Sequence, residues 1–483
     1  MTYLSKEAGV AVEDLTVVNK EIGWQDPVLA YDILRAPNSA FLESVSGSER
    51  IARYSLIALD PLLTIEGKNG KLRLILNDEE NVRAVDPLKE LFKILEELTT
   101  RELEKTMCGA IGYIGYDSAR HIEKIPEIAD DDLTLPDLLF FIPKITVIFD
   151  HHEKVATIYS IVSDGDRGIA RVKLKRIEDL LALGERNMGS MDRDKEETAK
   201  EATCDFISNF TKEDFERNVK RAKEYIFAGD IYQVNLSQRL TTVVSIDPYL
   251  IYRELRTVNP SPFSAYFDFG DWHMVSCSPE RLVKMTNDHI ETRPIAGTIR
   301  RGSASEEDRR LNKKLISDIK ERAEHIMLVD LERNDLGRVS DYGSVKVDEL
   351  MVMESYSHVT HIVSNVIGKL SNSRSRSDLV RACFPGGTIT GCPKVRAMEI
   401  IEELEPVRRG PYTGSMGYLS FNGDMDLNII IRTLIIKDGK AHVQAGAGIV
   451  ADSIPENEYY ETLSKAEALI KATMEAEAKS GGH

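Results

Sequence analysis

The sequence predicts a protein of mixed helices and strands that divides into at least two lobes. A chain of 483 residues is too long for one simple hydrophobic core. Its 42% apolar and 29% charged residues are typical of a globular protein. Segments with alternating apolar residues, which suit strands, are interspersed with segments of helical spacing. These three observations define the fold class before any motif is considered.

The first part of the chain predicts short strands with two helices, and then a change in composition. In order, the segments are strands at 39–61 around a turn at Gly47, a helix at 86–101, a strand hairpin at 138–149 and 155–162, and a helix at 171–183. After Gly184 the chain becomes rich in Gly, Ser, Asp, Glu and Lys and loses its periodic apolar face. We therefore expect a linker at 184–205 between an N-terminal lobe, 12–165, and a C-terminal lobe, 206–473.

The C-terminal lobe begins with a well-marked helix and a strand. Thr211 and Asp214 form a capping-box-like start, and Gly229 marks the end of the helix. Residues 231–240 alternate as in a strand, which places Gln233, Asn235 and Ser237 together on one polar face. Such a face is either solvated or lines a site.

Two later helices each carry a pair of glutamates three residues apart. A long helix is predicted at 307–331, with Glu321 and Glu324 on one face. Another begins at Ser453, and Glu458 and Glu461 lie within it. Two such pairs could share a hard cation such as Mg²⁺, which prefers oxygen ligands. Solvated glutamates, with Glu461 paired to Lys465, explain the same spacing.

Three further features suit an anionic ligand. Residues 386–391 form a glycine-rich loop before a helix that begins near Pro393, and free N–H groups at such a helix end attract anions. A tight turn before a core helix fits equally well. Gly446 and Gly448 allow either close backbone approach to a carboxylate or a bend. Arg432, within the buried-strand pattern at 428–436, needs a partner, and a substrate carboxylate would serve.

Composition argues against several classes of partner and location. The net charge of −17 disfavours nucleic acid and anionic membranes as general partners. No apolar run approaches the ~18 residues of a membrane span, and the first fifteen residues lack the pattern of a signal peptide. The five cysteines show no CxxC pair or zinc spacing, which suits a reducing cytoplasm.

Taken together, the motifs resemble those of the chorismate-utilising enzymes. They are IYQVNLSQR (231–239), SPERL (278–282), RPIAGTIRRG (293–302), AEHIMLVDLERNDLGRV (323–339), YSHVTHIVSNV (356–366), GGTITGCPKVRAMEIIEELE (386–405) and QAGAGIVADSIPENEYYETLSKA (444–466). The resemblance implies an α+β fold of two intertwined lobes with large antiparallel sheets flanked by helices. It places the active site in the cleft between the lobes.

Two positions separate the branches of this family. Gln233 stands where the water-adding branches carry a lysine base, and a neutral amide cannot deprotonate water. Ala296 stands where aminodeoxychorismate synthases typically carry a nucleophilic lysine. The chain is therefore similar to the large subunit (component I) of anthranilate synthase, a lyase that aminates C2 of chorismate and eliminates pyruvate. Component I of aminodeoxychorismate synthase is the alternative, because IYQVNLSQR is closer to that branch. A non-catalytic amino-acid-binding regulator on the same fold is a second.

The resemblance also implies roles for individual residues. Glu324 and Glu461 would bind Mg²⁺, with Glu321 and Glu458 nearby as direct or water-mediated ligands. Substrate contacts would come from Gly297, Thr298, Tyr412, Arg432, Gly446, Ala447, Gly448 and Lys465. Glu280 would protonate the departing C4 hydroxyl, and His361 would assist proton transfer. Thr388 would lie against the leaving side of the ring. Gln233 would occupy the position of the lysine base found in the water-adding branches.

The resemblance implies regulation and a partner as well. Leu42-Glu43-Ser44 resembles the tryptophan-feedback motif of anthranilate synthases, and the second half of that site falls on Pro262, Phe263 and Ser264. Enteric relatives carry Pro-Tyr-Met at these three positions, so this half of the motif departs from theirs. All the length is accounted for without a glutaminase domain, so a separate glutamine amidotransferase subunit (component II) would supply ammonia.

Overall fold

The computed structural model of the chain describes residues 15–45, 51–76, 79–188, 204–302, 305–355 and 359–481. The first part holds β1 (Leu15–Gly23), α2 (Pro27–Leu34), β2 (Ser39–Glu43), β3 (Tyr54–Lys68), β4 (Lys71–Leu76), β5 (Glu79–Ala84), α3 (Pro87–Leu98), β6 (Gly109–Ile114), η3 (Tyr116–His121), β7 (Leu138–Asp150), β8 (Val155–Ser163) and α4 (Arg167–Met188).

The second part begins with β9 (Ile207–Ser208), α5 (Lys212–Ala228), β10 (Gln233–Val243), α6 (Pro248–Val258), β11 (Phe263–Asp268), β12 (Trp272–Ser278), β13 (Arg281–Thr286), β14 (His289–Arg293) and β15 (Ile295–Arg300). It continues with α7 (Ser305–Ser317), α8 (Ile319–Gly337), β16 (Lys346–Ser355), β17 (Val359–Lys369), α9 (Arg376–Cys383), η5 (Gly387–Ile389), β18 (Gly391–Cys392), α10 (Lys394–Leu404), β19 (Ser415–Ser420), β20 (Met425–Ile429), β21 (Thr433–Lys437), β22 (Lys440–Ile449) and α11 (Pro455–Lys479).

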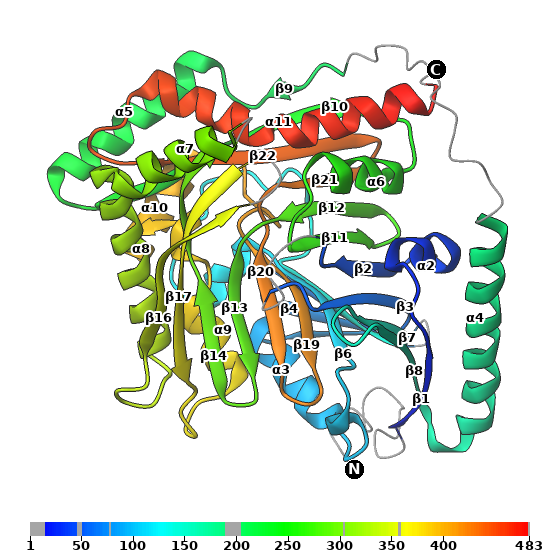
Figure 1. Cartoon of the computed structure of the whole chain (residues 1–483). Helices are drawn as coiled ribbons and strands as arrows, with labels where there is room; N and C mark the ends of the chain where they lie inside the picture. Colours follow the sequence, from blue (N-terminus) through cyan, green and yellow to red (C-terminus); the bar gives the residue numbers. More distant parts are fainter. Residues whose placement is uncertain are drawn as a thin grey trace.

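The strand ladders of the described residues run antiparallel, and they interleave the two parts of the chain. Strand β2 pairs with β11, so that Glu43 lies opposite Ser264. Strand β6 pairs with β19, where Gly112 lies opposite Gly417. Helices flank the sheet: α5, α8 and α10 lie at the left, α11 runs along the top over β22, and α4 stands at the right edge beside β1 (Figure 1). The predicted α+β fold with intertwined lobes is confirmed.

The elements with strong local signals are confirmed. The Thr211 hydroxyl accepts a hydrogen bond from the Asp214 N–H (3.1 Å) at the start of α5, and Gly229 ends the helix with φ +84°. The hairpin of β7 and β8 and the helix α3 lie where the apolar patterns predict them. No helix among the described residues is long and apolar enough to cross a membrane.

Two helix boundaries differ from the prediction. The expected helix at 307–331 is two helices, because Asp318 caps α8 by accepting hydrogen bonds from the N–H groups of Lys320 and Glu321. Helix α11 begins at Pro455 rather than Ser453. The Ser453 hydroxyl instead accepts the Val450 N–H (3.0 Å) and closes the preceding turn.

The start of the expected linker is also helical. Helix α4 continues through Gly184 to Met188, and residues 189–203 of the predicted linker lie outside the described residues. A Cβ atom at position 184 would come within 2.2 Å of Ile33 Cδ1. The glycine therefore permits close packing of α4 on α2, and it does not end the helix.

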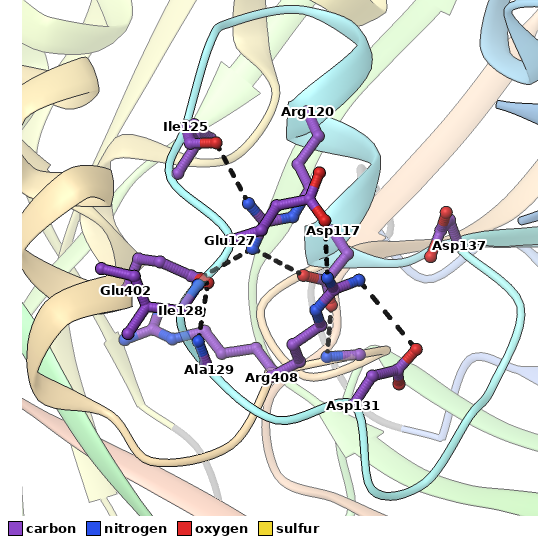
Figure 2. A network of polar contacts seen from close by, with 12 residues as sticks. Asp117, Arg120, Ile125, Glu127, Ile128, Ala129, Asp131, Asp137, Glu402 and Arg408 are labelled. Carbon is purple, nitrogen blue, oxygen red and sulfur yellow. Dashed lines mark hydrogen bonds and ion pairs between the residues drawn. The ribbon is translucent and has the colours of Figure 1, made fainter. Parts of the chain in front are cut away.

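A buried polar network ties the loop after β6 to α10 (Figure 2). Glu402 on α10 accepts hydrogen bonds from the N–H groups of Ile128 (2.7 Å) and Ala129 (3.0 Å) and from Arg120 Nη2 (2.7 Å). Asp117 accepts the Gly410 N–H (2.9 Å), and burial raises the pKa of its carboxyl to about 6. Because breaking a buried pair leaves an uncompensated charge, this network holds the two parts of the chain in one arrangement.

Candidate active site

A cavity of about 520 Å³ lies between α8, α11 and the strands β10, β15, β17 and β22. It gathers most of the residues that the motifs single out: Gln233, Glu280, Gly297, Glu321, Glu324, His361, Thr388, Tyr412, Arg432, Gly446, Gly448, Glu458, Glu461 and Lys465. Ala447 has its side chain in the hydrophobic core instead, because alternate residues of β22 point to opposite faces. Thr298 lies on β15 opposite His361.

Two glycines of β22 make room for the polar face of β10. Gly448 pairs with Asn235, and Gly446 pairs with Ser237, so the segment is regular strand rather than a bend. A Cβ atom at position 448 would lie 2.6 Å from Gln233 Nε2, and one at position 446 would lie 2.2 Å from Asn235 Oδ1. The glycines are therefore needed by the amide side chains that face them.

Four carboxylates line the cavity from two helices. Burial, followed by repulsion from neighbouring carboxylates, raises the pKa values of Glu321, Glu324 and Glu458 above their ordinary range. Gln233 Nε2 lies 3.5 Å from Glu324 Oε1. Lys465 Nζ lies 2.8 Å from Glu461 Oε1 and 3.0 Å from the Gly446 carbonyl, so the ion pair expected from the spacing is present.

The oxygen atoms of these four glutamates are suitable ligands for a hard cation, although they do not converge on one point. Among the described residues, no three carboxylate, histidine or cysteine side chains converge closely enough to form a ready metal site. Oxygen ligands of this kind are those that Mg²⁺ prefers, and it commonly keeps several waters and reaches carboxylates through them. A divalent cation would also relieve the repulsion that raises these pKa values.

Arg432 enters the cavity at a break between two strands. The predicted strand 428–436 is divided into β20 and β21, and Arg432 lies between them with φ +52°. Its Nη1 donates a hydrogen bond to the Lys465 carbonyl. With the Lys465 ammonium on the same wall, the break supplies positive charge for an anionic ligand.

The same cavity holds the candidate proton donor. Glu280 follows β12 and is 6% exposed. Burial raises the pKa of its carboxyl to about 7, while the Thr388 hydroxyl and the Ile295 backbone oppose that rise. Burial and the nearby Arg432 lower the pKa of His361 to about 4, so its imidazole is neutral at pH 7. A carboxyl that keeps its proton up to about pH 7 and a neutral imidazole thus face one cavity.

A second cavity of about 380 Å³ brings together Leu42, Glu43 and Ser44 with Pro262, Phe263 and Ser264. The pairing of β2 with β11 joins these two distant segments. The Glu43 carboxylate accepts hydrogen bonds from Tyr252 Oη (2.7 Å) and Arg256, while the Ser44 hydroxyl donates to the Tyr54 carbonyl (3.0 Å). Glu43 is therefore already paired, and Ser44 presents the smaller side chain to the cavity.

Two asparagines outside the predicted set of site residues also line these cavities. Asn235 Oδ1 in the first cavity and Asn428 Oδ1 in the second are buried without a hydrogen-bond partner among the described residues. The polar row of β10 signalled Asn235, but nothing local signalled Asn428. Next to Asn428, the Ile429 N–H donates to the Glu280 carbonyl (2.9 Å), so β20 lies between the two cavities.

Comparisons with known proteins agree on one family. Residues 38–471 match the family model described as chorismate binding enzyme. The chain is 47% identical over 433 residues to aminodeoxychorismate synthase component 1 of Bacillus subtilis, covering 88% of this chain and 90% of the relative. It is 45% identical over 451 residues to anthranilate synthase component 1 of Acetivibrio thermocellus, covering 90% of each. The crystal structure of anthranilate synthase component I from Streptococcus pneumoniae matches with a TM-score of 0.75 at 37% identity, covering 92% of this chain and 97% of that one.

Proposed function

Since the chain belongs to the family of chorismate-binding enzymes, we propose that it is the large subunit of anthranilate synthase. It converts chorismate and ammonia to anthranilate and pyruvate for tryptophan biosynthesis in the cytoplasm. A separate glutamine amidotransferase subunit supplies the ammonia. The convergence of Glu280, Glu324, Glu461 and Arg432 on one cavity supports an enzyme over a binding-only regulator.

The side chain of Ala296 is the observation that favours amination of chorismate at C2 over amination at C4. It lies on β15, lines the cavity and offers only a methyl group where a covalent route to C4 amination needs an amine. Two lysines line this cavity, Lys320 and Lys465. The Lys465 Nζ is already engaged by the Glu461 carboxylate (2.8 Å) and the Gly446 carbonyl (3.0 Å). Lys320 lies exposed in the first turn of α8.

The cavity residues divide the chemistry between binding and proton transfer. Arg432 and Lys465 attract the carboxylates of chorismate. Mg²⁺, held by Glu324 and Glu461 with Glu321 and Glu458 nearby, would neutralise the ring carboxylate. Glu280 donates its proton to the C4 hydroxyl as that group leaves, and Thr388 lies beside it.

The later steps use the neutral groups of the same cavity. Gln233 offers no base for water, so ammonia, which arrives already nucleophilic, attacks C2. Neutral His361 accepts a proton during elimination of pyruvate.

With chorismate, Mg²⁺ and ammonium, the purified chain is expected to release anthranilate and pyruvate. Fluorescence, chromatography and mass measurement identify the products. Glutamine should replace ammonium only after component II is added. Glu280→Gln serves as the control that assigns the product to this cavity, because it removes the proton donor.

Aminodeoxychorismate synthase component I is the second candidate, favoured by the 47% identity to the Bacillus subtilis relative. Finding 4-amino-4-deoxychorismate as the main product, without anthranilate fluorescence, would establish that candidate and reject the first.

The second cavity is the proposed site of tryptophan feedback. Ser44→Phe should fill it, because a phenyl ring replaces a small hydroxyl at its wall. The variant is expected to keep its turnover and to lose inhibition by tryptophan. Calorimetric titration of tryptophan into the variant, the parent and Ser373→Phe, a change in an exposed turn, checks this. Equal tryptophan binding by Ser44→Phe and the parent would show that the effector binds elsewhere.

A further inference from the structure

Helix α8 carries two of the cavity carboxylates. Polar side chains on its buried side attach the helix to neighbouring strands and to α10. His325 is fully buried on α8, and its Nε2 lies 2.6 Å from the hydroxyl of Ser364 on β17. The same hydroxyl accepts the Met351 N–H (2.9 Å) of β16. One serine thus connects α8 to two neighbouring strands.

Two further polar contacts hold the second half of the helix. Glu332 is 4% exposed, and its Oε2 atom accepts a hydrogen bond from the hydroxyl of Thr292 on β14 (3.0 Å). Asp335 is 3% exposed and pairs with Lys394, the first residue of α10, at 2.7 Å. Each contact reaches a different element, so together they constrain both the rotation and the sliding of α8.

The direction of these contacts matters for the cavity. Successive residues of a helix differ by about 100° in direction. Glu321 and Glu324 line the cavity from the first turns of α8. By this rule His325, Glu332 and Asp335 point within about 40° of the direction of Glu321, so the anchors lie on the same side of the helix as the cavity carboxylates. Apolar packing is non-directional, whereas a hydrogen bond weakens steeply when its angle changes. Polar anchors on the same side of α8 therefore specify where the two carboxylates point.

We propose that His325, Glu332 and Asp335 are positioning residues that set the rotation of α8 and so direct Glu321 and Glu324 toward the cation. The inference rests on the proposed Mg²⁺-dependent function and adds the means by which the fold prepares the site. Supporting groups of this kind typically change metal affinity or activity by about 10–100-fold.

The test compares three variants of the full chain. His325→Leu keeps the volume but loses the hydrogen bond, and His325→Gln keeps a polar atom within reach of Ser364. Val329→Ala is the matched control, since Val329 is buried on the same helix at 4% exposure and belongs to the hydrophobic core. Half-saturation by Mg²⁺ is measured from chorismate turnover and, independently, by calorimetric titration of Mg²⁺ with chorismate present and ammonia absent. The melting temperature of each variant is also recorded.

We expect His325→Leu to raise the half-saturating Mg²⁺ concentration at least ~10-fold by both measurements. Saturating Mg²⁺ should recover most of its turnover. His325→Gln should stay near the parent, and Val329→Ala should melt earlier without any change in Mg²⁺ half-saturation. If His325→Leu does not fold, Ser364→Ala removes the same bond from β17 and should give the same shift.

Two results would overturn the positioning role alone. One is an unchanged Mg²⁺ half-saturation in both His325→Leu and Ser364→Ala; the other is an equal shift in Val329→Ala. A parent chain that neither binds Mg²⁺ nor turns over chorismate would reject the proposed function, and the positioning role with it.

Discussion

Glu324→Gln or Glu461→Gln is expected to lower chorismate turnover at least ~100-fold. Each change keeps the shape of the side chain but removes one negative charge from a cavity proposed to hold a divalent cation. The loss should be largest at limiting Mg²⁺, because the remaining carboxylates attract the cation less strongly. Turnover is measured from anthranilate fluorescence over a range of Mg²⁺ concentrations.

The chain offers a matched control for this experiment. Glu467 lies on α11 and is exposed, as Glu461 is, but it does not line the cavity. Glu467→Gln changes the net charge by the same amount and should leave turnover unchanged. If both cavity variants kept the parent's turnover at limiting Mg²⁺, the carboxylates would have no role in metal binding.

Glu280→Gln is expected to lower turnover by ~10²–10⁴-fold, the range that general acid catalysis contributes. The amide keeps the size of the buried carboxyl but cannot donate a proton to the leaving C4 hydroxyl. Chorismate binding should persist, since Arg432 and Lys465 are unchanged. Calorimetric binding of chorismate beside the turnover assay separates the two effects, and a variant with the parent's turnover would rule out Glu280 as the acid.

The pH profile tests the same residue. Because burial raises the pKa of Glu280 to about 7, the carboxyl is protonated below that pH and loses its catalytic proton above it. Free ammonia increases throughout this range, since ammonium loses its proton only at much higher pH. With ammonium as substrate, the logarithm of the rate should therefore rise to about pH 7 and then level off. In Glu280→Gln the small residual rate should rise without a break, and a parent profile lacking any break near pH 7 would contradict the assignment.

The sequence by itself determined the elements whose signals are local. The Thr211 cap, the glycine end at Gly229 and the apolar stripe of α3 each depend on residues within one helix. The polar face of β10 follows from strand alternation alone. The motifs that the chain shares with a known family indicated the chemistry of the cavity. These signals are readable because the interacting residues are close in the chain.

Only the tertiary structure decided where regular patterns break. The run 428–436 has the composition of one buried strand, but β20 pairs with β19 while β21 pairs with β12 and β22. Separate pairings on the two sides force the break that points Arg432 into the cavity. Gly184 is similar, since the close approach of Ile33 explains a glycine within α4.

The tertiary structure also decided which residues form the two cavities and which residues anchor α8. Ser44 meets Phe263 because β2 pairs with β11, more than two hundred residues along the chain. His325 meets Ser364, and Glu332 meets Thr292, through contacts between separate elements. Such contacts depend on strand register and helix rotation, which are set by the packing of the whole chain and leave no periodic trace in the residues on either side.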